Sequence, residues 1–258
     1  MLQMVRASVL TPRLKRIVFG GDLEDFPTGS DGYHIKLFFP RKNQTRPVLP
    51  TLGPDGPIWP PPDQKPITRT FTIQHFDHSA SELHIDFVIH DHGTAGRWAR
   101  HAKPGDHLGL AGPGNDPFPR GYTTHLIAGD LSASPAIAAF LKTLPSDARA
   151  TVFMEVPEPS DRLEMPSPAD IAIHWFYLKQ RPSASNQLLE AVRKTPISRQ
   201  DTAAIIAGES SAVVAIRDYL RDNYGMTKRN LYAVPYWQDG STEEAYHDER
   251  HRIMDQNT

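Results

Sequence analysis

The sequence contains no cysteine among its 258 residues. This absence excludes disulfide bonds, a thiolate nucleophile, and zinc or iron–sulfur sites that cysteine would hold. If the protein moves electrons, the sequence predicts that it does so with a bound organic cofactor or with another kind of metal site.

The chain also lacks long apolar runs and a strong charge of either sign. No apolar run reaches the roughly 18 residues of a membrane-spanning helix, so we expect no membrane insertion. Residues 1–16 contain no apolar core followed by a small-residue cleavage site, which predicts a cytoplasmic protein. The net charge of −2 provides no basic field, and no nucleic-acid partner is expected.

Residues 1–115 are predicted to form an antiparallel β-barrel of six strands. The strands are expected at 5–9, 14–19, 34–39, 69–73, 82–89 and 107–111. Leu83, Ile85 and Phe87 alternate with polar residues, which is typical of a half-buried strand. Residues 40–66 are dense in proline, glycine and charge, and we expect a long irregular loop there.

A short helix is expected between the last two strands of this barrel, with Thr94 as its cap. Its predicted apolar face is formed by Ala95, Trp98, Ala99 and Ala102. Glycines at the start of a helix leave backbone N–H groups open to an anion, and the helix dipole favours phosphate there. Two interpretations stay open: Gly93 and Gly96 belong to a phosphate-binding turn, or they only shape the turn.

Residues 122–258 are predicted to form an α/β domain with a C-terminal tail, joined to the barrel by a linker at 113–121. Strands are expected at 125–129, 151–156, 171–178, 203–207 and 231–235, which gives a mostly parallel five-stranded sheet. Helices are predicted to begin at Ser134, at Ser185, and at Ser210 or Ser211, the last of them ending at Gly225. A solvated terminal helix is expected at 243–252.

One stretch of the barrel, Arg69-Thr70-Phe71-Thr72-Ile73, has the composition of a ligand site. Alternation along a strand places Arg69, Phe71 and Ile73 on one side and the two threonines on the other. A guanidinium can bind pyrophosphate with two hydrogen bonds, and a threonine can reach ring heteroatoms. These residues therefore suit a ligand with a planar ring and a phosphate tail, although an ordinary β-strand also explains them.

Several blocks along the chain occur in a fixed order with this stretch. They are Arg69-Thr70-Phe71-Thr72, His90 with 93–99, Lys103-Pro104-Gly105-Asp106 before Gly112-Pro113, 128–136, Ala207-Gly208-Glu209, and Tyr236-Trp237-Gln238-Asp239-Gly240. Together they resemble the siderophore-interacting proteins, a family of ferredoxin–NADP-reductase-like flavoproteins that includes ferric-chelate reductases. The chain departs from the family pattern where Phe71 replaces a tyrosine, Leu131 an acid, Ser132 a threonine and Gly96 a serine.

The resemblance implies a bound FAD. It places Arg69 at the pyrophosphate, Phe71 against the ring and Thr72 near its reactive edge. Gly93, Thr94 and Ala95 would hold the pyrophosphate from the other side. The matching blocks imply further cofactor-binding residues at Thr70, His90, Trp98, Asp130, Ser132, Glu209 and Trp237. No catalytic acid or base is implied, because the cofactor performs the redox chemistry.

The same resemblance implies a monomeric enzyme that reduces Fe(III) in a ferric siderophore or chelate with electrons from NADPH or NADH. The nucleotide would bind at the carboxyl ends of the parallel strands, although no Gly-x-Gly-x-x-Gly is present. Lys179 and Arg181 are expected to meet a 2′-phosphate or an anionic siderophore, or to be a solvated pair. The alternative function is a siderophore-binding flavoprotein, or a ferredoxin-coupled reductase that uses no nicotinamide.

Twelve histidines raise the question of a metal site. His90 and His92 form one candidate pair, and His247 and His251 form another at helical spacing. Neither pair is completed by further ligands at a recognised spacing, so no protein-bound metal is predicted.

Overall fold

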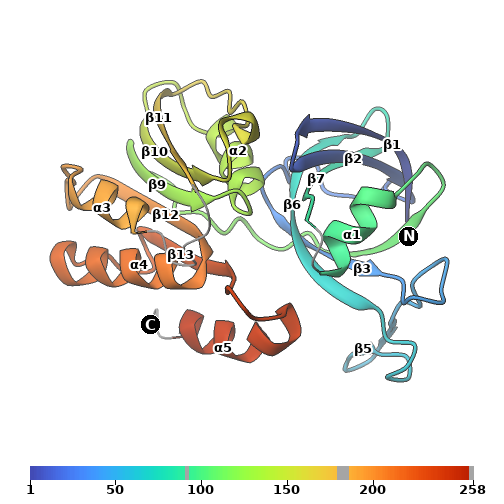
Figure 1. Ribbon diagram of the computed structural model, residues 1–258. Helices are drawn as coiled ribbons and strands as arrows, with labels where there is room; N and C mark the ends of the chain where they lie inside the picture. The colour runs from blue at the N-terminus through green and yellow to red at the C-terminus, as the bar shows by residue number, and fades with distance from the viewer. Residues whose placement is uncertain (91–92, 179–185, 256–258) are drawn as a thin grey trace. The chain divides into compact units, whose positions relative to one another are not determined.

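The computed structural model describes residues 1–90, 93–178 and 186–255, and it divides into two compact units, Met1–Asp116 and Pro117–Thr258 (Figure 1). Within these residues, no helix is both long enough and apolar enough to cross a membrane. Each unit has its own hydrophobic core.

The first unit is a closed barrel of six strands, as predicted. The strands are β1 (Leu2–Thr11), β2 (Leu14–Gly21), β3 (His34–Phe39), β6 (Ile67–Asp77), β7 (Glu82–Val88) and β8 (His107–Ala111). They pair in the order β1-β2-β7-β6-β3-β8, and every neighbouring pair is antiparallel. Closure leaves no unpaired edge within this sheet.

The predicted alternation of β7 is confirmed, with one exception. Leu83, Ile85 and Phe87 all lie in the barrel core. Asp86 is also buried, although it alternates with Ile85 and Phe87 and therefore lies on the opposite face of the strand. The guanidinium of Arg16 on β2 accounts for this, since it donates two hydrogen bonds to the Asp86 carboxylate, at 2.7 and 2.9 Å.

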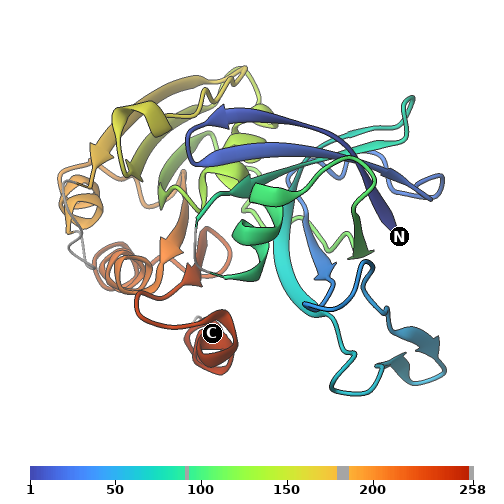
Figure 2. The same cartoon turned by 45° about the vertical axis from the view of Figure 1, so that its right-hand side comes forward.

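Two predictions for the first unit are wrong in detail. The segment 40–66 is not wholly irregular, because β4 (Thr51–Gly53) and β5 (Gly56–Ile58) form a hairpin that projects from the barrel (Figure 2). Thr94 does not cap the helix α1 (Thr94–His101). Its cap is Gly93, whose φ of 79° suits glycine, and among the described residues no side chain caps the helix start. The expected apolar face is confirmed, with Ala99 buried and Ala95, Trp98 and Ala102 packed against the core.

The second unit is an α/β domain with a five-stranded sheet, as predicted. Its elements are β9 (Thr124–Asp130), α2 (Ser134–Lys142), β10 (Arg149–Val156), a 3-10 turn (Pro159–Asp161), β11 (Asp170–Tyr177), α3 (Gln187–Arg193), β12 (Thr202–Glu209), α4 (Ser210–Tyr224), β13 (Leu231–Trp237) and α5 (Glu243–Asp255). The strand order is β11-β10-β9-β12-β13, and all four pairings are parallel.

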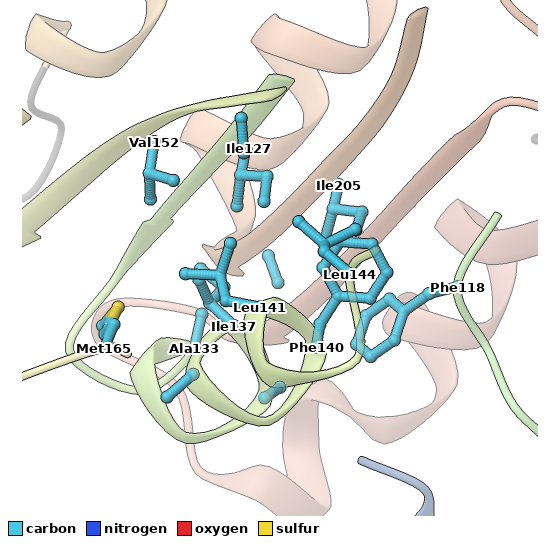
Figure 3. Close-up of a cluster of buried hydrophobic side chains, with 14 of the residues drawn as sticks. Phe118, Ile127, Ala133, Ile137, Phe140, Leu141, Leu144, Val152, Met165 and Ile205 are labelled. Carbon is cyan, nitrogen blue, oxygen red and sulfur yellow. The ribbon is translucent and has the colours of Figure 1, made fainter. Parts of the chain in front are cut away.

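Helices cover both faces of this sheet. On one face, α2 buries Ile137, Phe140 and Leu141 against Ile127 and its strand neighbours (Figure 3). On the other face, α3 and α4 pack against Leu126, Ala128 and Ile206. The strand order reverses between β9 and β12, where the following helices take opposite faces. Open parallel sheets usually bind ligands at the carboxyl ends of the strands at this point.

Two helices of the second unit begin where they were predicted, α2 at Ser134 and α4 at Ser210, but other residues cap them. Ser134 is the first residue of α2, and its hydroxyl donates to Leu131 O at 2.8 Å instead of capping the helix. The cap of α4 is Glu209, one residue before the predicted serines. Gly225 ends α4 in the left-handed conformation, as expected. Ser185, the predicted cap of the preceding helix, lies outside the described residues.

The terminal helix α5 is anchored to the domain. Tyr246 is only 1% exposed, and its hydroxyl donates to Ser210 Oγ at 2.7 Å. The expectation of a fully solvated helix is therefore wrong for this face. The ring of Tyr246, in the first half of the helix, buries apolar surface that the charged pattern did not indicate.

Candidate functional site

The Arg69 stretch forms part of β6 and pairs with β3. Arg69 and Phe71 stand opposite Leu37 and Ile35, which are buried in the barrel. Thr70 and Thr72 stand opposite Lys36 and His34 on the other face. The predicted division of this stretch into two faces is therefore confirmed.

Phe71 belongs to an aromatic cluster that joins β6 to α1. Its ring centroid lies 4.4 Å from that of Phe87 and 6.2 Å from that of Phe39. Trp98 of α1 completes the cluster, stacked on Phe19 at 6.1 Å and edge-on to Phe39 at 5.7 Å. The ring of Trp98 thus packs largely on the barrel core, and the cluster fixes α1 relative to the strand that carries Arg69.

The start of α1 is shaped by two glycines that pack against His90. A Cβ added at Gly96 would lie 2.8 Å from Cδ2 of His90, and one added at Gly93 would lie 3.1 Å from Cε1. The last turn is held by Lys15, whose Nζ donates to Ala99 O at 2.7 Å. No acidic residue lies in the first turn, so the N–H groups there face no competing carboxylate from the helix itself. The helix start therefore has the character of an anion site.

Two residues of β3 were missed by the sequence analysis. Lys36 donates through Nζ to Thr70 Oγ1 at 2.6 Å, and His34 pairs with Thr72 in the ladder. Partial burial, assisted by the charge of Lys36, lowers the pKa of His34, which keeps its imidazole neutral. The pairing of β3 with β6 brings these two residues next to the threonines, and no local sequence pattern predicts that pairing.

In the second unit, Asp130 lies at the carboxyl end of β9 and is 9% exposed. Its carboxylate accepts four hydrogen bonds. Oδ1 receives the backbone N–H of Ser132 at 2.8 Å and the Ser132 hydroxyl at 2.5 Å. Oδ2 receives the backbone N–H of Glu209 and the indole N–H of Trp237, each at 2.8 Å. The structure therefore brings together Asp130, Ser132, Glu209 and Trp237, four residues that the sequence placed at a cofactor site.

Burial raises the pKa of Asp130, and the four donated hydrogen bonds only partly oppose this effect. Two lone pairs on each carboxylate oxygen are matched by the four donors, so this carboxylate has no further acceptor capacity. Its contribution to ligand binding must therefore pass through the groups that it holds.

Glu209 caps α4 with its own side chain. Oε2 accepts from the backbone N–H groups of Ser211 at 2.7 Å and Ala212 at 3.3 Å, and from the Ser211 hydroxyl. The carboxylate thus occupies the donors at which a dinucleotide fold commonly binds phosphate. Glu155 at the end of β10 was missed by the sequence analysis, and it lines a small pocket together with Asp130 and Glu209.

Some predicted residues fall outside the structural description. Lys179, Arg181 and His92 lie in segments that are not described, and so do the side chains of His247 and His251. Within the ranges that are described, no three histidine or acidic side chains are arranged to hold a metal ion.

Sequence profiles of two families together cover most of the chain. Residues 3–116 match the siderophore-interacting FAD-binding domain, and residues 122–240 match the siderophore-interacting protein family.

Several curated relatives carry names that describe an activity. The ferric vibriobactin reductase ViuB of Vibrio cholerae is 39% identical over 261 residues, which cover 99% of this chain and 95% of that protein. The NADPH-dependent ferric-chelate reductase of Escherichia coli is 39% identical over 145 residues, covering 55% of this chain and 56% of that protein.

Solved structures agree with the architecture. The siderophore-interacting protein SipS from Aeromonas hydrophila superimposes with a TM-score of 0.86 at 37% identity, covering 98% of this chain and 97% of that one. A ferredoxin–NADP+ reductase from Plasmodium falciparum gives a TM-score of 0.64 at 12% identity, covering 91% of this chain and 95% of that one. The second match shows a shared fold only.

Proposed function

The chain belongs to the siderophore-interacting protein family of ferredoxin–NADP-reductase-like flavoproteins, and we propose that it reduces ferric siderophores with electrons from a reduced nicotinamide, preferably NADPH. The observation that carries the proposal is the packing of two elements suited to binding an anion in one barrel. The strand with Arg69 and the start of α1 are held together by the cluster of Phe71, Phe87 and Trp98.

The barrel residues fit an FAD. The Arg69 guanidinium and the N–H groups at the start of α1 suit a pyrophosphate, which needs several strong donors. Thr70 and Thr72 present hydroxyl groups on the outer face of β6, next to Lys36 and His34. A neutral imidazole and two hydroxyls suit the polar edge of a flavin. We assign binding and orientation to these residues, and no proton transfer.

When bound, FAD supplies the conversion of a two-electron hydride donor into single electrons for iron. Hard oxygen ligands such as hydroxamate or catecholate bind Fe(III) far more strongly than Fe(II). Reduction therefore loosens the chelate and releases the metal. The names of the Vibrio and Escherichia relatives support this substrate class.

The α/β domain is proposed to receive the nicotinamide nucleotide at the carboxyl ends of β9, β12 and β13. Trp237 supports this assignment, because the residue is 41% exposed while its N–H group is fixed by Asp130. The name of the Escherichia coli relative favours NADPH over NADH.

One observation favours the alternative of a ferredoxin-coupled reductase. The Glu209 carboxylate occupies the amide donors of α4, and Asp130 occupies those of the turn before α2. A nucleotide diphosphate would meet two acids where an ordinary dinucleotide fold offers open N–H groups.

Anaerobic stopped-flow spectroscopy separates the two candidates. The FAD-loaded protein is mixed with NADPH, NADH or reduced ferredoxin, and the flavin absorption is followed. The proposal expects rapid bleaching by NADPH, and bleaching by ferredoxin alone would support the alternative. The predicted monomeric state and cytoplasmic location stay predictions, which sedimentation and cell fractionation test.

A further inference from the structure

A buried carboxylate and an exposed tryptophan form a single unit at the carboxyl edge of the sheet. Trp237 ends β13 and is 41% exposed, whereas Asp130, which accepts the indole N–H at 2.8 Å, is 9% exposed. A buried carboxylate therefore holds the hydrogen-bonding edge of an exposed indole ring. Such a pair restricts the rotation of a side chain that solvent alone would leave free.

The backbone of β12 lies close to the Asp130 carboxylate. Gly208 has a φ of 134°, and a Cβ added there would lie 2.6 Å from Oδ2 of Asp130. A glycine at this position thus allows β12 to approach the acid closely. The next residue, Glu209, then donates its N–H group to the same oxygen at 2.8 Å. Asp130 is enclosed by protein groups on three adjacent strands and their turns.

Holding the strands together does not by itself explain an acid at this position. Burial raises the pKa of Asp130, which means that the ionised form is destabilised by the site. Backbone pairing already joins β9 to β12 and β12 to β13. The exposed group that this acid orients is the indole ring of Trp237, which is held at one edge by the hydrogen bond to Asp130.

We propose that Asp130 is a positioning residue, which contacts no ligand itself and fixes the Trp237 ring as a stacking surface for a planar ring of the nicotinamide nucleotide. This inference rests on the proposed function for the identity of the ligand. Aromatic rings stack best in offset geometry, so the orientation of the ring matters as well as its presence. The acid also holds the N–H group of Glu209, which ties the stacking surface to the start of α4.

Two variants separate the anchor from the ring. Asp130→Asn preserves the size of the side chain but replaces one acceptor oxygen with an NH₂ group. The two groups that donate to that oxygen in the wild type then face another donor and lose their hydrogen bonds. Trp237→Phe keeps an aromatic ring and removes the indole N–H. Tyr236→Phe is the matched control, because it removes a neighbouring hydroxyl that lies 3.3 Å from the Tyr232 hydroxyl.

The experiment is anaerobic bleaching of the FAD-loaded protein over a range of NADPH concentrations. Asp130→Asn and Trp237→Phe are each expected to raise the half-saturating NADPH concentration about three- to tenfold, the range of one stacked aromatic pair. The limiting bleaching rate and the FAD content should not change. The double variant should be no worse than the weaker-binding single variant, because both changes break one unit. Tyr236→Phe should behave as the wild type.

Nuclear magnetic resonance provides a readout that a purely structural role would not move. The chain has four tryptophans, and the indole signal of Trp237 is identified by its loss in Trp237→Phe. In the wild type this indole proton should exchange slowly with solvent and shift when NADPH is added. In Asp130→Asn it should exchange faster, while the other three indole signals stay in place.

Three results would overturn the inference. They are an unchanged half-saturating concentration in Asp130→Asn, an unmoved Trp237 signal, and effects that multiply in the double variant. If Asp130→Asn does not fold, an unchanged half-saturating concentration in Trp237→Phe is decisive against it. A wild-type flavin that neither NADPH nor NADH bleaches would instead overturn the proposed function.

Discussion

Arg16 and Asp86 form a two-pronged ion pair within the wall of the barrel, with Nε–Oδ1 and Nη2–Oδ2 distances of 2.7 and 2.9 Å. The aspartate side chain is completely buried and the arginine side chain is partly exposed. The pair stands on β2 and β7, and hydrogen bonding to Asp86 raises the pKa of Arg16. Asp86 is thus a buried carboxylate that Arg16 holds with two hydrogen bonds.

Arg16→Ala is expected to destabilise the barrel by about 3 kcal/mol, because it leaves a buried carboxylate without its guanidinium. The change is measured by urea unfolding of the FAD-free protein. Arg6→Ala is the matched control, since Arg6 also pairs with an acid on β7, Glu82, but from an exposed position. A loss in Arg6→Ala as large as that in Arg16→Ala would contradict the argument from burial.

Arg69→Ala is expected to weaken FAD binding by about one to two powers of ten. A charged hydrogen bond to phosphate contributes roughly 1.5–3 kcal/mol, and Arg69 is not part of the hydrophobic core of the barrel. Fluorescence titration of the apoprotein with FAD gives the affinity. Thr68→Ala, next along the strand, serves as the control. Equal affinities of the Arg69→Ala variant and the wild type would show that Arg69 is only a strand residue.

Gly96→Ala tests how closely His90 packs on the start of α1. The new Cβ would lie 2.8 Å from the His90 ring and 2.9 Å from its carbonyl oxygen, so the segment before the helix must shift. Alanine favours a helix by about 1 kcal/mol, yet overpacking costs roughly 1–3 kcal/mol. We expect a net loss of stability and weaker FAD binding.

Gly20→Ala provides the comparison for this variant, because its Cβ would meet only the exposed Val5 side chain, at 3.3 Å. Unfolding and FAD titration are measured on both proteins. A Gly96→Ala variant that is more stable than the wild type, with unchanged FAD affinity, would contradict the close packing of His90 on the start of α1.

Both architectures followed from the sequence because their signals are periodic. Leu83, Ile85 and Phe87 alternate as a half-buried strand must, and the second half of the chain switches between strand and helix patterns. Each predicted strand exists, and the barrel closes with six of them. The errors lie at element ends, where Thr94 and Ser134 are the first helical residues and do not cap the helices that they begin.

The site was only partly accessible from sequence. Motif resemblance singled out Asp130, Ser132, Glu209 and Trp237, and they meet. It could not show that the Asp130 carboxylate is used up by hydrogen bonds within the protein. Nor could it reveal Lys36 beside Thr70, because that contact depends on the register of β3 against β6. The burial of one residue and its neighbours on the next strand are set by the folded chain, so the local sequence does not reveal them.

Asp130 also predicts a pH dependence of stability. Its folded pKa is raised above the ordinary value of about 3.8, so the folded state binds this proton more tightly than the unfolded state does. Between these two pKa values, the contribution of Asp130 to stability therefore falls as the pH rises. Asp130→Asn should lack this slope, so the wild-type stability should decline relative to the variant. Urea unfolding from pH 4 to pH 7 measures the difference, and a difference that rises with pH would contradict the sign.

The most direct test of the proposed reductase is a single anaerobic turnover. Protein-bound FAD is first bleached with one equivalent of NADPH and then mixed with a ferric siderophore and a ferrous-iron indicator. The account predicts that the flavin absorption returns while about two Fe(II) form for each FAD, since the cofactor carries two electrons. A reduced flavin that stays bleached in the presence of ferric siderophore, or a recovery without Fe(II), would contradict it.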